Sequence, residues 1–324
     1  MRRATGLAIE GWSPEYGAPV ESEMEDVPAD KVDASVEIDE GEWRPLDGDG
    51  TPNPRADFVD GVRRMEARVW IAGRDGESRL GVCASFAAGL VRCGERATVD
   101  TVKVGRGFFA LAGAPDLATR AGNFRACPVA EDDMPQLVNG LQERMWNLEV
   151  EVAASRGGTD RPGDSLLVLD GPLRGRRPIP GAIGYVKSHR VHYLPDLPRQ
   201  TVARLGAGQR TPVFLIQTRW TRYSWYMRLT EARGHPWAGI VRCEAWTEQG
   251  LDAAKKTADR AAATLPRFAS EPHKDDRAPQ NLYPIAGLER ELGRRLGDRG
   301  FVYRALQQAA ATFAPGALAK GGPA

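Results

Sequence analysis

The sequence predicts an α/β fold built on a mixed sheet, and three observations lead to this expectation. Three consecutive stretches rich in β-branched and aromatic residues are separated by glycine and charged turns, which is typical of an antiparallel meander. A long stretch with apolar residues at helical spacing follows them. The continuous apolar run of residues 165–170 comes next, and such a run favours a central strand that is buried on both faces.

The first elements are expected at residues 58–72, 80–91 and 98–111 (strands) and 134–155 (helix). Asp132 or Asp133 can cap the start of this helix. Further strands are expected at residues 182–187, 213–218, 223–229 and 239–246, and further helices at residues 251–265, 288–296 and 303–313. Three antiparallel strands, a helix and then a central parallel strand follow the order of the ribonuclease-H fold. We therefore expect a ribonuclease-H-like core with extra C-terminal strands and helices.

The chain has 324 residues, 42% of them hydrophobic, and can bury the core of one large domain or two small ones. Residues 1–56 are rich in glycine, proline and acidic side chains, and we expect them to form an irregular acidic N-terminal arm. Residues 57–313 are expected to form the domain that contains the sheet. Residues 314–324 are expected to be a disordered tail.

Composition excludes several classes of protein. The sequence contains no run of eighteen apolar residues and no signal peptide at its N-terminus, so we expect a cytoplasmic protein without a membrane span. The four cysteines lack CxxC spacing, which argues against structural zinc and favours free thiols. The net charge is +1, so the chain is not basic overall, and binding of nucleic acid would require a local basic groove. Arginine outnumbers lysine, which suits phosphate binding but is equally explained by a GC-rich genome.

Two apolar runs end in an aspartate followed by a glycine. Asp60 follows Phe58 and Val59, and Asp170 ends the run of residues 165–170. A single Asp-Gly pair is usually a turn, whereas a buried aspartate costs free energy unless it is paired or binds a cation. The expected topology places the two strands side by side, so we expect the two carboxylates to lie close together.

Further carboxylates come from the expected helices. Glu149 and Glu151 point about 200° apart on a helix, so only one can face the aspartates, and Glu149 is preferred. Glu289 or Glu291 can supply a fourth carboxylate. Each of these glutamates taken alone is more often part of a solvated helix face. Three or four convergent carboxylates suit Mg²⁺ or Mn²⁺, and two such ions about 4 Å apart can assist phosphodiester cleavage.

Basic residues stand near these carboxylates in the sequence. Lys187 is a candidate contact for the scissile phosphate. Three arginines are candidate contacts for the DNA backbone, although a solvated loop explains them equally well: Arg174, Arg176 and Arg177. The aromatic segment of residues 220–226 is a candidate for stacking on bases or for a dimer contact. Core packing in a strand explains at least half of its side chains.

These pieces together resemble the NurA family of nucleases, which act with the HerA-type hexameric ATPase in DNA end processing. The matching segments extend over residues 58 to 295: Val59-Asp60-Gly61, residues 168–173, residues 184–187 and Tyr283-Pro284. The resemblance implies a ribonuclease-H-like homodimer that cleaves DNA ends and single strands with Mn²⁺ or Mg²⁺. It maps the metal carboxylates onto Asp60, Glu149 (Glu151 is the alternative) and Asp170.

The resemblance also maps a site tyrosine onto Tyr283. The family usually has a histidine eight residues later, and Glu291 stands there in this chain. A glutamate still binds a hard cation, so Glu291 is a candidate fourth ligand, or else activity is reduced. The N-terminal arm is the part expected to dock on the ATPase. The alternative is that the arm covers a second protomer or the chain's own sheet.

Two other functions compete with a DNA nuclease. The first is a catalytically inactive ribonuclease-H-like module that binds DNA or the ATPase, and Glu291 is its main support. The second is an unrelated enzyme with a small-molecule substrate. The sequence lacks the glycine-rich nucleotide motifs and the GxSxG elbow of such enzymes, and a deep apolar pocket in place of an open acidic groove would favour this alternative again.

Overall fold

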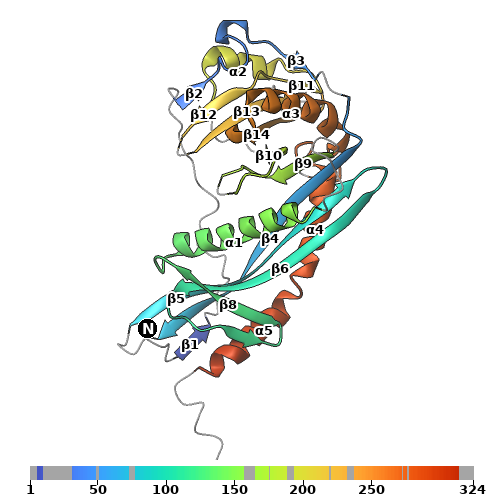
Figure 1. The fold of residues 1–324 in the computed structure, drawn as a ribbon. Helices are drawn as coiled ribbons and strands as arrows, with labels where there is room; N and C mark the ends of the chain where they lie inside the picture. Colours follow the sequence, from blue (N-terminus) through green and yellow to red (C-terminus); the bar gives the residue numbers. More distant parts are fainter. Residues whose placement is uncertain are drawn as a thin grey trace, which may run out of the picture.

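The computed structural model describes residues 6–9, 31–48, 51–72, 77–156, 165–174, 176–187, 193–218, 220–231, 237–271, 273–275 and 277–313. It is a mixed α/β structure in which most strands join one large sheet. Figure 1 shows an elongated molecule with an upper and a lower lobe, and the long strands of the lower lobe reach up to the upper one. No helix within the described residues is long and apolar enough to cross a membrane.

The centre of the sheet is a meander of three long strands with two shorter parallel strands beside it. β4 (Arg55–Ala72), β5 (Ser78–Cys93) and β6 (Ala97–Leu111) are antiparallel neighbours. β9 (Ser165–Asp170) runs parallel to β4 on its other side, and β10 (Ala182–Val186) runs parallel to β9. The central order is therefore β6-β5-β4-β9-β10. The expectation that the two strands carrying the Asp-Gly pairs are neighbours is confirmed.

Two helices cover opposite faces of the meander. α1 (Met134–Ala154) begins after Asp133, whose side chain accepts a hydrogen bond from the backbone N–H of Gln136 at 2.8 Å, as expected for an aspartate cap. Its apolar side chains form one core cluster with β4, β5 and β6. α4 (Tyr283–Arg295) packs on β4 and β5, and its leucines belong to a different core cluster. Successive strand residues point to opposite faces, which is why one meander supplies both clusters.

The remaining elements extend the sheet at both ends (Figure 1). In the upper lobe they are β14 (Ile240–Trp246), β13 (Thr221–Arg228), β12 (Phe214–Gln217), β11 (Gln209–Arg210), β2 (Val32–Asp33), β3 (Leu46–Asp47), α2 (Asp196–Ala203) and α3 (Leu251–Thr264). In the lower lobe they are β1 (Gly6–Ile9), β7 (Leu117–Thr119), β8 (Gly122–Val129) and α5 (Arg299–Ala311). Short 3-10 helices lie at Glu40–Glu42, Thr247–Gln249 and Leu265–Phe268.

The N-terminal arm is more ordered than the sequence suggests, because its described parts join the sheet. β1 pairs with the last residues of β4, while β2 and β3 pair with β12 and β11. Trp43 is buried, and its indole N–H donates to the carbonyl of Ala34 at 2.7 Å. The described parts of the arm are thus strands of the chain's own sheet. Trp12, Tyr16 and the tail of residues 314–324 lie outside the described residues.

Other elements differ from expectation for identifiable reasons. α4 begins at Tyr283 rather than near residue 288, because Pro284 occupies the first turn, where proline is tolerated. α2 and β8 were not expected, since Pro198 and Pro128 within them weaken the local pattern. The four cysteines are buried free thiols, as expected: Cys83, Cys93, Cys127 and Cys243.

Candidate functional site

The parallel pairing of β4 and β9 brings the two predicted aspartates together. In the register of these strands, Asp60 and Asp170 directly follow the last paired position. Because side chains alternate along a strand, Asp60 shares a face with Phe58, and Asp170 shares a face with Val168. Phe58 and Val168 belong to one core cluster, which also contains the leucines of α4. The two carboxylates therefore lie on the face of the sheet that α4 covers.

Glu289 of α4 completes a group of three carboxylates. One oxygen from each of Asp60, Asp170 and Glu289 lies within 4.8 Å of the other two. Two members come from neighbouring strands and the third from the helix packed on them. Of the two C-terminal glutamates considered from the sequence, Glu289 is the one that the structure brings to the aspartates.

Two oxygens of this group are buried without a hydrogen-bond partner in the described part of the chain: Asp60 Oδ2 and Asp170 Oδ1. Asp60 is only 5% exposed, and its other oxygen, Oδ1, accepts a hydrogen bond from the backbone N–H of Gly61 at 2.7 Å. A buried acceptor without a partner costs about 1–3 kcal/mol. A hard divalent cation satisfies such oxygens, so the three carboxylates fit Mg²⁺ or Mn²⁺.

Burial and mutual repulsion shift the titration of these carboxylates. Burial raises the pKa of Asp60 well above its ordinary value of 3.8, and the charges of Asp170 and Glu149 raise it further. Burial also raises the pKa of Asp170, while the ammonium group of Lys187 opposes that shift. Like charges this close resist simultaneous ionisation, and a bound cation relieves the repulsion.

Lys187, the residue after β10, holds Asp170 and is itself held by Asn281. Lys187 Nζ lies 2.9 Å from Asp170 Oδ2, and it donates to Asn281 Oδ1 at 2.9 Å. Asn281 is fully buried, and its Nδ2 donates to Asp275 Oδ2 at 2.6 Å. Lys187, predicted as a phosphate contact, is therefore brought to the carboxylates. Its side chain keeps 20% of its surface exposed.

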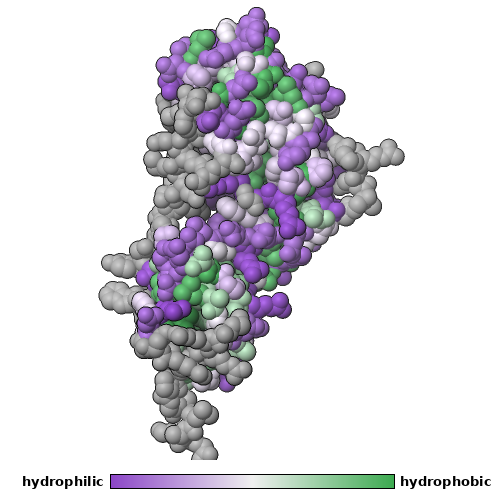
Figure 2. Space-filling view, turned by 60° about the vertical axis from the view of Figure 1, so that its left-hand side comes forward, coloured by the Kyte–Doolittle hydropathy of each residue, from purple (hydrophilic) through white to green (hydrophobic). Residues whose placement is uncertain are grey.

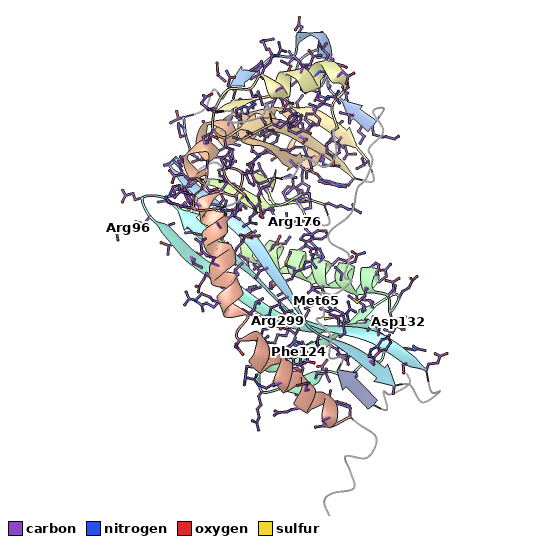
Figure 3. All side chains as sticks on the ribbon, turned by 180° about the vertical axis from the view of Figure 1, so that it is seen from behind. Met65, Arg96, Phe124, Asp132, Arg176 and Arg299 are labelled. Atoms are coloured by element: carbon purple, nitrogen blue, oxygen red, sulfur yellow. The ribbon has the colours of Figure 1, made fainter. Side chains whose placement is uncertain are left out.

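Glu149 approaches the strands from the opposite face, on α1. It is buried, and its carboxylate pairs with the guanidinium of Arg176. Arg176 also donates to the carbonyls of Asp170 at 2.7 Å and Pro172 at 2.9 Å, and it lies between α1 and the upper lobe (Figure 3). Burial raises the pKa of Glu149, and Arg176 opposes this shift. Glu149 thus lies near Asp60 but is neutralised by an arginine, and Arg176 faces inward rather than toward a DNA backbone.

Glu291 lies apart from the three carboxylates. Two residues beyond Glu289, it points about 200° away around the helix. It pairs instead with Arg294 at 3.3 Å and with Arg295 at 2.7 Å, both on the same helix. The predicted fourth ligand is therefore a half-buried member of α4 that pairs with arginines of its own helix.

The remaining predicted residues take varied positions. Glu151 is exposed and pairs with Lys103 at 3.0 Å, which leaves Glu149 as the inward glutamate of α1. Arg177 is exposed, and Arg174 is half-buried. In the aromatic segment of residues 220–226, Trp225 and Tyr226 are buried core residues, while Trp220 and Tyr223 are half-buried: these last two are the remaining candidates for a contact.

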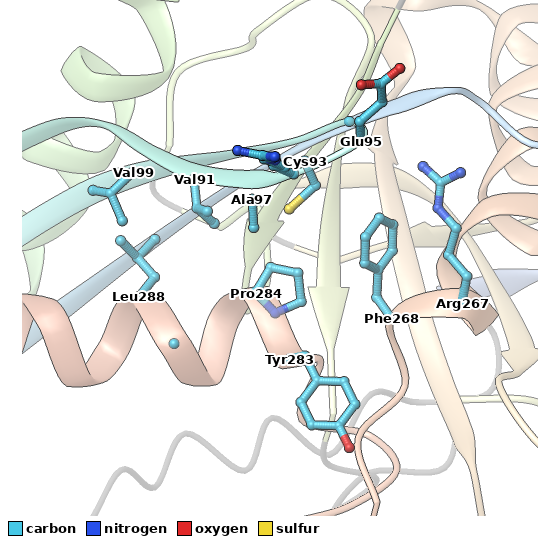
Figure 4. A pocket seen from close by; sticks show the side chains of 13 residues that line it. Val91, Cys93, Glu95, Ala97, Val99, Arg267, Phe268, Tyr283, Pro284 and Leu288 are labelled. Atoms are coloured by element: carbon cyan, nitrogen blue, oxygen red, sulfur yellow. The ribbon is translucent and has the colours of Figure 1, made fainter.

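A cavity of about 400 Å³ lies at the N-terminal end of α4, where side chains such as Val91, Val99 and Leu288 face one another (Figure 4). Tyr283 lines this cavity, and its ring points away from the strands. Its hydroxyl donates to Glu271 Oε2 at 3.1 Å. The three carboxylates do not line the cavity, so the predicted site tyrosine is separate from them.

A buried ion cluster holds the turn that follows Asp170. Glu244 of β14 accepts hydrogen bonds from Arg222 Nε at 2.9 Å, from Arg242, and from the backbone N–H of Leu173 at 2.9 Å. Burial alone raises the pKa of Glu244, but these three donors outweigh it and lower the pKa below 4.5. Because the same carboxylate accepts from Leu173 and from both arginines, the turn after Asp170 is fixed to β14, two strands away in the sheet.

Sequence reasoning missed two residues of the site, Asn281 and Arg277. Arg277 donates to both oxygens of Glu289, from Nη1 to Oε1 at 3.1 Å and from Nη2 to Oε2 at 2.6 Å. From the sequence, residues 271–279 before α4 are expected to form a loop, and this expectation gives them no role in the site. The concentration of charged and amide side chains directly before a helix that carries acidic residues was the available signal.

No model of a known protein family matches this chain, and no characterised protein matches it either. Oxygen-only ligands, one buried and two half-buried, beside a lysine and an arginine are suited to a divalent cation and to an anionic ligand bound next to it.

Proposed function

We propose that this chain is a metal-dependent DNA nuclease in which Asp60, Asp170 and Glu289 hold Mn²⁺ or Mg²⁺. The observation that carries the proposal is the convergence of these carboxylates with two buried oxygens that lack a partner within the described residues. Enzymes that hydrolyse phosphodiesters use hard cations in such oxygen-lined sites. The neighbouring Lys187 adds the positive charge that favours a phosphate.

The sheet supports a ribonuclease-H-like core as the framework of this nuclease. The meander β4-β5-β6 is followed along the chain by α1 and then by β9, which runs parallel to β4. This is the order expected of that fold, and the two aspartates lie on its adjacent parallel strands. Figure 2 shows hydrophilic side chains gathered at the waist between the two lobes, a surface compatible with nucleic acid.

In this proposal the carboxylates hold the cation, and Lys187 contacts the phosphate. A divalent cation at the site supplies positive charge that polarises the phosphodiester and stabilises the departing oxygen. Asp60 and Asp170 contribute their unpaired oxygens, and Glu289 contributes the third. Lys187, held by Asn281, keeps Asp170 in place and presents an ammonium group to a phosphate.

The test is cleavage of a 5′-labelled single-stranded DNA in the presence of Mn²⁺. We expect Asp60→Asn and Asp170→Asn to abolish cleavage while circular dichroism shows an intact fold. Glu151→Gln, an exposed change on α1, is the matched control and should cleave normally. Cleavage at the wild-type rate by either aspartate variant, or cleavage that persists in EDTA, contradicts the proposal.

The resemblance to the NurA family extends the proposal to partners. We propose a homodimer that processes DNA ends and single strands with a HerA-type hexameric ATPase. The sequence carries no ATP-binding motif, so opening a duplex requires a separate motor. Light scattering at micromolar concentration tests the dimer, and a clean monomer argues against it.

A second candidate is a catalytically inactive module that binds DNA or the ATPase. It is favoured by the arginines that neutralise two carboxylates, Arg176 on Glu149 and Arg277 on Glu289. Glu291, at the position of the family histidine, also favours it. Binding of single-stranded DNA without any Mn²⁺- or Mg²⁺-dependent cleavage is the result that selects this candidate over the nuclease.

A further inference from the structure

Two of the three carboxylates are held by cations that differ greatly in exposure. Lys187 on Asp170 is 20% exposed and is fixed by a second contact with Asn281. Arg277 on Glu289 is 56% exposed: its guanidinium donates to that carboxylate at 3.1 and 2.6 Å, and its Nε lies 3.6 Å from Asp275 Oδ1. Lys187 is therefore fixed within the site, whereas Arg277 is bound to its carboxylate at the protein surface.

Both oxygens of Glu289 accept hydrogen bonds from Arg277. A metal ion bound by Glu289 therefore shares this carboxylate with the positive guanidinium, and the two positive charges repel each other. An exposed ion pair is weak because water and salt screen it. A divalent ion at this site would gain three carboxylates, Asp60, Asp170 and Glu289, against this one exposed pair.

We propose that Arg277 competes with the metal ion for Glu289 and that the displaced guanidinium binds a phosphate of the substrate DNA. This inference rests on the proposed nuclease function. On this proposal the position of the Arg277 side chain depends on both the metal ion and the DNA phosphate.

The backbone around Arg277 is arranged for such a movement of the side chain alone. Asp275 Oδ1 accepts the backbone N–H of Arg277 at 2.8 Å, and Asp275 Oδ2 accepts the side chain of Asn281 at 2.6 Å. Through Asp275, the backbone of Arg277 is thus connected to Asn281, which also holds Lys187. A guanidinium released from Glu289 stays close to the carboxylates, and its planar, two-pronged geometry matches phosphate oxygens.

A purely structural role for Arg277 makes the opposite prediction. If Arg277 only orients Glu289, its removal weakens metal binding. If it competes with the metal, its removal strengthens metal binding. Arg295 provides a matched control, because it is 59% exposed and pairs with Glu291 on the same helix at 2.7 Å, away from the carboxylate group.

The first measurement is calorimetric titration of the intact chain with MnCl₂. We expect Arg277→Gln to bind Mn²⁺ about 3-fold more tightly than the wild type, since exposed ion pairs are worth that order of affinity. Arg295→Gln should bind it unchanged. Weaker or unchanged Mn²⁺ binding by Arg277→Gln, in a variant that melts at the wild-type temperature, overturns the proposal.

The second measurement uses thymidine 5′-monophosphate added to the Mn²⁺-loaded protein. Arg277→Gln should bind this nucleotide on the order of 10-fold more weakly, which is the loss of a charge-assisted phosphate contact. Arg295→Gln should bind it normally. Unchanged nucleotide binding by Arg277→Gln overturns the phosphate contact. If the wild type does not bind Mn²⁺, the proposed function itself is wrong. If the wild type binds Mn²⁺ and cleaves DNA but Arg277→Gln does not show the expected changes in binding, only the role of Arg277 is wrong.

Discussion

Glu149 lies over Gly61 so closely that the position has no room for a side chain. A Cβ atom added to Gly61 would come within 2.5 Å of Glu149 Oε1 and 2.9 Å of Met145 Cγ. Gly61 follows Asp60 directly, so the missing side chain lets α1 approach the strand beside the candidate site. Burial and the charge of Asp170 raise the pKa of Asp60 most, and the charge of Glu149, which approaches from the α1 face, adds to this rise.

Gly61→Ala is expected to destabilise the fold by about 2 kcal/mol, because the methyl group overpacks the contact between α1 and β4. Urea unfolding monitored by circular dichroism measures the change. Gly293→Ala in α4 is the control, since no atom lies within 4 Å of its added Cβ and alanine favours a helix. Equal stability of the two variants means that the close approach at Gly61 is not present in solution.

Glu289→Gln is expected to weaken Mn²⁺ binding and DNA cleavage by at least 10-fold, because it removes one of three charged ligands. Glu291→Gln should alter neither, since Glu291 pairs only with exposed arginines of its own helix. Calorimetry and the single-strand cleavage assay compare the two. If Glu291→Gln weakens Mn²⁺ binding and cleavage and Glu289→Gln does not, Glu291 is the metal ligand instead of Glu289.

Asp60→Asn is expected to raise the melting temperature of the metal-free protein at pH 7 by about 2 °C or more. The pKa of Asp60 is raised in the folded chain, so ionisation of this acid opposes folding once the pH exceeds its unfolded value, and the amide removes that cost. Asp170→Asn should gain less, because it leaves Lys187 without its carboxylate. Scanning calorimetry in EDTA decides, and a lower melting temperature for Asp60→Asn refutes the expected repulsion.

Glu149→Gln is expected to cost about 3 kcal/mol of unfolding free energy, since it leaves the buried guanidinium of Arg176 without a counter-charge. Its loss of cleavage should be smaller than that of Asp60→Asn, because Glu149 is outside the group of three carboxylates. Glu151→Gln should stay within about 0.5 kcal/mol of the wild type. Chemical denaturation and cleavage rates per folded molecule test both statements. Complete loss of cleavage in a stable Glu149→Gln protein returns Glu149 to the metal site.

Glu244→Gln is expected to destabilise the fold by about 3 kcal/mol at pH 7, since Arg222 and Arg242 lose their shared carboxylate. The pKa of Glu244 is lowered in the folded chain, so its contribution is present above the ordinary value of 4.5 and is lost as the pH falls through the folded pKa. The gap between variant and wild type should therefore narrow below pH 4.5. A gap that is constant from pH 7 to pH 3 excludes this ionic origin.

The sheet and its two aspartates were predictable from local pattern. Residues 165–170 form a strand because their continuous apolar run has to be buried on both faces, and the structure gives β9 the same bounds. The adjacency of Asp60 and Asp170 followed from the order of strands and helix, since a strand after a crossover helix packs in parallel beside the first one.

The choice between Glu289 and Glu291 was not predictable, because it depends on the phase of a helix whose first residue was misplaced. Pro284 was interpreted as preceding the helix, whereas it lies inside the first turn. The partner of Glu149 was also out of reach, because Arg176 returns from a turn far along the chain and no local spacing encodes that contact.

β4 takes part in both lobes, and this limits how the molecule can move. Its 18 residues extend about 60 Å, pairing with β9 at one end and with β1 at the other, and β5 accompanies it along almost the whole length. A hinge between the lobes would have to break this continuous ladder of hydrogen bonds. The spacing of the carboxylates on β4 and β9 is therefore insensitive to lobe motion, and a substrate has to reach them without a change in the angle between the lobes.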